Sequence, residues 1–193
     1  MKAIPPITRE TTRLLLRPLE ADDERDFVRL VETSREAWAP WTPAWDPDSD
    51  PAERFRREVT RGSTGRASGT HLRLGAFDRT GELIGLFALN EVVRGVFQSC
   101  HASWQVGVTR MGDGLGTEGV AALLEVAFSE PADGLALHRV QANVMPRNAA
   151  SLRVAEKVGF RREGVALRYL KIAGAWEDHV MHAVTREEWR DAR

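Results

Sequence analysis

A glycine-rich stretch near the middle of the chain has the residue types needed to hold a phosphate. Glycine alternates with other residues in Gly112-Asp113-Gly114-Leu115-Gly116-Thr117, which leads directly into a strongly apolar helical pattern. Glycines let the backbone approach a ligand closely, and the free N–H groups at a helix start attract anions. A plain strand-to-helix turn needs fewer glycines, so the spacing favours a pyrophosphate site.

The pyrophosphate could belong to a dinucleotide, because Gly114, Gly116 and Gly119 spell GxGxxG. A dinucleotide-binding unit should open its domain, and an acidic residue should end its next strand. Here the motif lies past the midpoint of the chain, and the next predicted strand ends at Asn143-Val144. A nucleotide-binding Walker loop is excluded as well, since no GK[ST] follows the glycines. The context therefore argues against both nucleotide sites.

A second group of residues with chemical potential begins at Asn148. The side chain of Asn148 can cap a helix, and Ser151 then lies in its first turn, while Gly159 suits a helix C-terminal turn. The cap alone accounts for Asn148, and Ser151 could simply bond to backbone. Because a predicted phosphate loop lies one strand upstream, we favour a functional role for Ser151.

The elements that would position these residues are of both kinds. Apolar alternation and turn residues predict strands over 13–18, 71–77, 82–93, 99–108, 139–144, 160–172 and 176–184. Helical spacing predicts helices over 22–38, 51–61, 115–129 and 148–158, with an irregular segment at 39–51 and a loop at 61–69. The order predicts a mixed α+β chain with a meander in the middle and one late crossover.

Composition narrows the class of protein. The chain has 193 residues, 42% of them apolar and 28% charged, with a formal net charge of −1. That balance disfavours non-specific binding to nucleic acid or an anionic membrane. The lone Cys100 allows no internal disulfide, which fits the cytoplasm, and residues 1–12 hold no long apolar run. We expect one domain over 1–193, without a membrane span, a signal peptide or a metal site.

The glycine loop between a strand and a long helix resembles the signature of the GNAT superfamily of N-acetyltransferases, Q/R-x-x-G-x-G/A. The resemblance covers about residues 11–189 and implies a central, mostly antiparallel twisted sheet with a splayed strand pair. It also implies acetyl-CoA as co-substrate, with Val106 and Val108 pairing with its pantetheine arm. The resemblance implies that the other coenzyme contacts are Met111, Gly112, Asp113, Gly114, Leu115, Gly116, Thr117, Asn148 and Arg153.

The chain departs from the family pattern just before the glycines. The family's Q/R position falls on Met111, with Arg110 one residue earlier, and the stretch between strand and glycines is shorter than in the family. The sequence therefore leaves open which of Arg110, Met111 and Gly112 meets the phosphate.

A finer resemblance is to the Rim-type branch, whose enzymes acetylate the N-termini of ribosomal proteins. That branch is similar in the motif from Asn148 to Phe160, in the hairpin from Glu163 to Asp178 and in the segment from Trp38 to Trp45. Many GNAT enzymes carry a catalytic Tyr where this chain has Ala155. The Rim-type branch lacks that Tyr, so the resemblance implies that Ser151 protonates the leaving thiolate.

Acetyl transfer also needs a proton acceptor and a donor for the developing oxyanion. The donor is expected to be a backbone N–H between Val106 and Val108. The acceptor stays open: Glu91 could act directly or through water, or its neighbour Asn90 could face the cleft instead, because the two alternate along a strand. His71, His101 and water are further candidates.

Three functions follow in order of preference. The first is acetylation of a protein N-terminal α-amine, and the second is acetylation of a small amine such as an antibiotic, polyamine or amino acid. The third belongs to another class, a non-catalytic acyl-CoA-binding module. Whether the chain works as a monomer or as a homodimer is left open.

Overall fold

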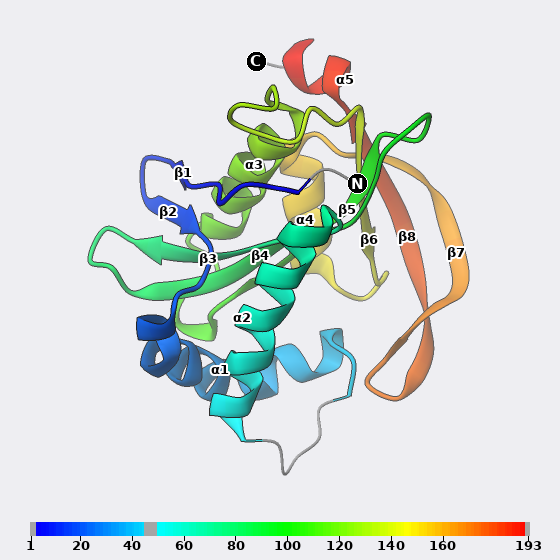
Figure 1. The fold of residues 1–193 in the computed structure, drawn as a ribbon. Helices are drawn as coiled ribbons and strands as arrows, with labels where there is room; N and C mark the ends of the chain where they lie inside the picture. Colours follow the sequence, from blue (N-terminus) through cyan, green and yellow to red (C-terminus); the bar gives the residue numbers. More distant parts are fainter. Residues whose placement is uncertain (1–2, 45–49, 192–193) are drawn as a thin grey trace.

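A computed structural model describes residues 3–44 and 50–191, and within them eight strands form one sheet ordered β1-β2-β3-β4-β5-β6-β8-β7 (Figure 1). Every neighbouring pair is antiparallel except β5 and β6, which are parallel. The strands are β1 (Arg9–Glu10), β2 (Leu14–Arg17), β3 (Leu72–Asp78), β4 (Leu83–Val93), β5 (Ser99–Val106), β6 (Arg139–Val144), β7 (Arg161–Ile172) and β8 (Ala175–Thr185). The predicted mixed fold with a mostly antiparallel sheet is confirmed.

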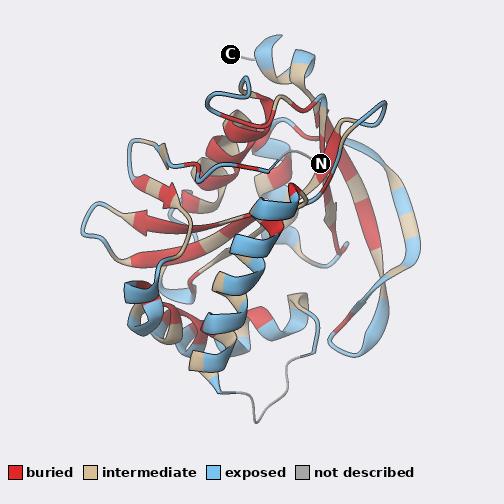
Figure 2. Ribbon diagram, viewed as in Figure 1, coloured by how far each residue is buried: buried red, intermediate tan, exposed pale blue. Residues whose placement is uncertain are grey.

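Two pairs of helices cover the sheet, one pair on each face (Figure 1). The helices are α1 (Glu24–Trp38), α2 (Pro51–Ser68), α3 (Leu115–Phe128), α4 (Ala149–Val158) and the short α5 (Arg186–Asp191). Phe27 and Phe55 of α1 and α2 pack with Phe77 and Leu83 in one buried cluster. The larger core lies between the sheet and α3 with α4, and Figure 2 shows that the outer side of α2 and much of β7 stay exposed.

The middle of the sheet splits, and this split positions the site. β5 and β6 pair only over three residues, from Ser99 opposite Arg139 to His101 opposite Gln141. Beyond that point the end of β5 is held by α1 instead: the Trp38 indole Nε1 donates to the Val106 carbonyl at 2.9 Å. The Val106 carbonyl is thus bonded to α1 and not to β6, and beyond His101 the two strands diverge.

The structure differs from the sequence prediction at two boundaries and in two short elements. The strand predicted over 99–108 ends at Val106, and Val108 begins a short helical turn. The predicted loop over 61–69 is wrong, since α2 continues to Ser68 and ends at Gly69, whose φ is 74°. Gly65 belongs to this extension because a Cβ there would lie 2.6 Å from the His71 Cβ, so only glycine lets the helix approach β3. The strand β1 and the helix α5 were also missed, because they are too short to show periodicity.

Other predictions concern single residues and absences. Cys100 is buried in β5, and this burial raises the pKa of its thiol, so its role as a core residue holds. None of the helices in residues 3–44 and 50–191 is long and apolar enough to cross a membrane. The same residues hold no group of three His, Cys, Asp or Glu side chains that could bind a metal ion.

Candidate active site

A cavity of about 500 Å³ lies where β5 and β6 separate. One wall is the free end of β5 from Ala102 to Val106, and the opposite wall is β6 and the turn after it, from Asn143 to Met145. The starts of α3 and α4 line it on one side, while Trp38 and Trp41 line it from the α1 side. The cavity thus reaches both faces of the sheet, so two substrates could meet within it.

The glycine-rich loop borders the cavity as the sequence predicted, with Met111, Gly112, Gly114, Leu115, Gly116 and Thr117 in its wall. Gly112 and Gly114 have φ values of 90° and 79°, which favour glycine strongly. Helix α3 begins at Leu115, directly after them, so its first backbone N–H groups lack partners within the helix. A loop of this kind fits a pyrophosphate, and a Cβ at Gly112 would meet open space.

Arg13, just before β2, holds this loop in place. Its Nη1 donates to the Asp113 carbonyl at 2.8 Å, and its Nε donates to Glu118 in the first turn of α3 at 2.6 Å. Burial by itself raises the pKa of Glu118, but hydrogen bonds from Thr11 and Arg13 bring it below its ordinary value. Sequence reasoning missed Arg13, because nothing local links it to a loop a hundred residues later.

Arg110 is held by an acid on another strand. Its Nη1 donates to Asp78 Oδ2 at 2.9 Å, and its Nε lies 3.7 Å from Asp113 Oδ2. The pKa of Asp78 is lowered overall, since hydrogen bonds from Thr80, Glu82 and Arg110 outweigh the effect of its burial. Arg110 lines the cavity but already has carboxylate partners, whereas Met111 and Gly112 are held by no side chain that the structure describes.

Helix α4 presents the second predicted motif to the cavity. Asn148 caps it by accepting from the Ser151 N–H at 3.1 Å, so the serine backbone is held while its hydroxyl is left to the cavity wall. Arg153 and Lys157 follow on the same helix, and all four residues line the cavity. The helix therefore brings a hydroxyl and two cations to the side of the cavity that the glycine-rich loop also lines.

Two of the backbone N–H groups expected to stabilise the oxyanion already have acceptors within the protein. The Gly107 N–H donates to the Ile84 carbonyl at 2.8 Å, and the Val108 N–H donates to Ser34 Oγ at 3.0 Å. Val106 lines the cavity, whereas Val108 lies in the turn after the strand and is not among the lining residues that the structure describes. Asp113 is likewise absent from that lining.

The other face of the cavity is built from side chains far apart in sequence. Trp38 and Trp41 come from the end of α1 and the short helix after it, while Asn143 and His179 come from β6 and β8. The Arg147 guanidinium lies 5.1 Å from the centre of the Trp41 ring. The Ala173 N–H donates to the Thr42 carbonyl, which ties the β7–β8 hairpin to this segment. Trp45, part of the segment predicted to form the acceptor side, lies outside the described residues.

The two candidate proton acceptors on β4 differ in how they lie relative to the cavity. Neither Asn90 nor Glu91 is among the described residues that line the cavity. Asn90 Nδ2 donates to Ser103 Oγ at 2.9 Å, so Asn90 reaches the cavity through Ser103. Glu91 occupies an irregularity of β4, with a φ of 51°, and its side chain is 72% exposed.

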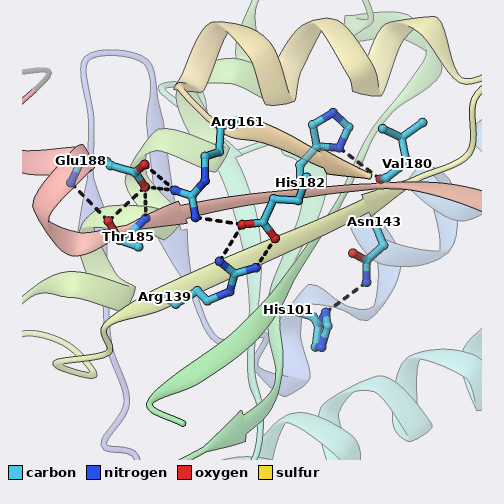
Figure 3. A network of polar contacts seen from close by, with 9 residues as sticks. His101, Arg139, Asn143, Arg161, Val180, His182, Thr185 and Glu188 are labelled. Atoms are coloured by element: carbon cyan, nitrogen blue, oxygen red, sulfur yellow. Dashed lines mark hydrogen bonds and ion pairs between the residues drawn. The ribbon is translucent and has the colours of Figure 1, made fainter. Parts of the chain in front are cut away.

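The two candidate histidines are also outside that lining. Burial lowers the pKa of both His71 and His101. His71 Nδ1 lies 2.8 Å from Thr70 Oγ1. The Nδ1 of His101 lies 3.1 Å from Asn143 Nδ2, as Figure 3 shows, and its Nε2 lies 3.8 Å from Glu91 Oε2.

The split sheet, the glycine loop and the two helix starts agree with what a search of family models finds. Residues 13–161 match the acetyltransferase (GNAT) domain, so the chain belongs to the GNAT acetyltransferase family.

Individual relatives narrow the resemblance. The chain is 33% identical to a probable N-acetyltransferase, YjcK of Bacillus subtilis, over 89% of this chain and 93% of that protein. It is 30% identical to the [ribosomal protein uS5]-alanine N-acetyltransferase of Escherichia coli, over 98% and 96% of the two chains. Among solved structures, Mycobacterium smegmatis RimJ in complex with CoA-disulfide superposes with a TM-score of 0.87 at 29% identity, covering 97% of this chain and 91% of that one.

These findings confirm the resemblance to the Rim-type branch. The chain is an acetyl-CoA-dependent N-acetyltransferase, which argues against the alternative of a non-catalytic binding module.

Proposed function

We propose that the chain is a single catalytic domain that acetylates the N-terminal α-amine of a protein, with a ribosomal protein as the first candidate. The 30% identity to a ribosomal-protein N-acetyltransferase, extending over nearly the whole of both chains, is the observation that carries this proposal. The length of the matched region matters because it includes the segment from Trp38 to Trp45 and the β7–β8 hairpin, and not only the glycine-rich loop. A ribosomal acceptor places the reaction in the cytoplasm.

On the coenzyme side, backbone N–H groups from Gly112 to Thr117 would hold the pyrophosphate. Arg153 and Lys157 line the same cavity and would add positive charge near the phosphates. The edge of β5 at Val106 runs along the cavity with no β6 neighbour. Its carbonyl already accepts from Trp38, so the Val106 N–H is the group at this edge that would pair with the pantetheine arm.

Ser151 would supply a proton or a hydrogen bond to the leaving thiolate. It lies on the coenzyme side of the cavity, and the position where many relatives carry a Tyr is the fully buried Ala155. The amine attacks directly, so the site needs no covalent nucleophile.

The chemistry of the amine supports an α-amine acceptor. An α-amine has a pKa of about 8, against about 10.4 for a Lys side chain, so a useful fraction is neutral near pH 7. A site without an ionised strong base in its wall therefore suits an α-amine better than a Lys. An aromatic pair such as Trp38 and Trp41 can pack on the first residues of an extended peptide.

Acetylation rates of a matched peptide set test the proposal. Peptides beginning with Ala, Ser or a large residue are compared with the same peptides whose N-termini are blocked, each carrying an internal Lys. We expect acetylation of the free α-amine, fastest after a small first residue. Equal rates for the blocked peptides, or turnover of small amines only, would rule out the N-terminal acceptor while leaving the acetyltransferase assignment intact.

A further inference from the structure

His179 is a buried histidine in the acceptor-side wall of the cavity, and sequence reasoning did not single it out. It is 3% exposed, and its Nδ1 lies 3.0 Å from the carbonyl oxygen of Glu177. A carbonyl can only accept, so this contact requires the hydrogen on Nδ1. The Nε2 of the neutral ring is then a lone-pair acceptor, and the described part of the chain offers it no hydrogen-bond partner.

Neighbouring side chains fix the orientation of this ring. Tyr169 packs its ring edge against His179, with 5.7 Å between ring centres and an interplanar angle of 66°. The Tyr169 hydroxyl accepts from Asn143 Nδ2 at 3.3 Å, which ties β7 to β6. An irregularity of β7 makes this contact possible: Arg168 has a φ of 48°, and its N–H donates to Asp178 Oδ1. A ring held this way keeps one tautomer and one position.

The location of His179 suits proton removal from the acceptor. Val144 pairs with Val180 in the β6–β8 register, so Asn143 and His179 lie on the face opposite to these valines. That is the side on which Trp38 and Trp41 close the cavity, while Ser151 approaches from α4. An amine between the two sides would have a proton acceptor on one side and a proton donor on the other.

We propose that Nε2 of His179 is the general base that takes the proton from the attacking amine. The amine nitrogen forms a bond to the thioester carbonyl carbon, and the C–S bond breaks. The proton lost by nitrogen goes to Nε2, and the thiolate sulfur gains one through Ser151. The imidazolium then returns its proton to solvent and Ser151 regains one from solvent, so no further reactant is consumed.

The groups around His179 leave it the best-placed base. Glu177 forms an ion pair with Arg147 at 2.8 Å. Asp178 accepts a hydrogen bond from the Arg168 N–H, and His101 is hydrogen-bonded to Asn143. Glu91 is exposed, lies 3.8 Å from His101 Nε2, and is not among the described residues that line the cavity. Of these groups, His179 alone is among the described residues that line the cavity.

His182 provides a matched control on the same strand. It is also buried, and Figure 3 shows its Nδ1 beside the Val180 carbonyl, at 3.1 Å. His179 makes the same two-residue contact with Glu177. It points to the other face of β8 and is not part of the cavity wall that the structure describes. Comparing His179→Gln with His182→Gln therefore separates catalysis from the cost of losing a buried imidazole.

The experiment measures release of the coenzyme A thiol with the acceptor amine that the wild type uses best. We expect His179→Gln to lower kcat about a hundred-fold, with acetyl-CoA affinity and melting temperature close to those of His182→Gln. Added imidazole should restore part of the activity of His179→Ala. It should not raise the activity of Ser151→Ala. The inference concerns acetyl transfer itself, so it can be tested even where a small amine replaces the proposed peptide.

Two results would overturn the proposal. One is a folded His179→Gln variant that binds acetyl-CoA and keeps kcat within about threefold of His182→Gln. The other is a low kcat in His179→Ala that imidazole does not raise at any concentration, together with a normal kcat in His179→Gln. Failure of all peptides as acceptors would speak against the proposed function alone.

Discussion

The two sides of the cavity are built in different ways. The side that we propose binds the coenzyme comes from two short continuous segments, 106–117 and 148–157, and presents mainly backbone groups at helix starts. The proposed acceptor side comes from residues as distant as Trp38, Asn143 and His179, and presents side chains. A backbone site depends on local conformation and tolerates little change, whereas a side-chain site can vary from one relative to another. The specificity of the enzyme is therefore expected to lie on the acceptor side.

The largest effect is expected on the coenzyme side, at Gly114. A Leu there would be forced into a φ of 79°, at a cost of about 1–2 kcal/mol, and its side chain would enter the space needed for close backbone approach to a phosphate. We expect Gly114→Leu to weaken acetyl-CoA binding by about a hundred-fold or more, measured by calorimetry. Gly95→Leu is the control, because Gly95 has a φ of 71° in the β4–β5 connection, away from the cavity. Equal affinities of the two variants would remove the loop from coenzyme binding.

The next effect concerns turnover at Ser151. The substitution Ser151→Ala removes the hydroxyl but keeps the backbone N–H, which donates to Asn148 Oδ1, so the helix cap persists. We expect kcat to fall about a hundred-fold with little change in acetyl-CoA affinity, because a proton-transfer group is lost and no binding contact is. Steady-state kinetics at saturating acetyl-CoA measure it, with Ser129→Ala at the end of α3 as control. An unchanged kcat would point to solvent as the proton donor.

A smaller, selective effect is expected on the acceptor side. Trp41→Ala should raise KM for a peptide acceptor about tenfold, since an aromatic contact contributes about 0.5–1.5 kcal/mol beyond its buried area. The affinity for acetyl-CoA should stay within about twofold, because the coenzyme side is separate. Trp176→Ala is the control, as Trp176 is 62% exposed on the β7–β8 hairpin. A parallel loss of acetyl-CoA affinity in Trp41→Ala would mean that the two sides are not independent.

The smallest effect lies outside the cavity, in an ion-pair network near α5. Glu163 accepts from Arg139 at 2.9 Å and from Arg161 at 2.8 Å, and Arg161 also pairs with Glu188 (Figure 3). The hydrogen bond from Arg139 is the main reason that the pKa of Glu163 falls to about 2. A lowered folded-state pKa contributes stability above the unfolded value of about 4.3, which is lost as pH falls toward 2.

The substitution Glu163→Gln should therefore cost at most about 1 kcal/mol at pH 7, because partly exposed ion pairs are screened by solvent. It should also flatten the loss of stability between about pH 4.3 and 2. Urea unfolding at pH 7 and pH 3 measures both. A variant that loses stability with acid as steeply as the wild type would show that other carboxylates, such as Glu118, dominate.

Local sequence patterns were enough to predict the parts of this protein that depend on neighbouring residues. The glycines at 112 and 114, the cap at Asn148 and the serine one turn later act through local conformation, so their spacing predicted the glycine loop and the two helices that border the cavity. The resemblance in these motifs also predicted the family that the comparisons confirm. The local pattern predicted a loop over 61–69, where the structure has helix. Its glycine at 65 is required by close contact with the start of β3, and not by a turn.

The side chains that meet across the split sheet are brought together by long-range packing and strand pairing. Arg13 reaches the loop a hundred residues later, and the register of β6 with β8 brings Asn143 and His179 to one face. The divergence of β5 from β6 depends on Trp38 bonding to Val106, a contact between elements 68 residues apart. Strand pairing and helix packing place such residues together, and neither leaves a periodic or spacing signal in the sequence itself.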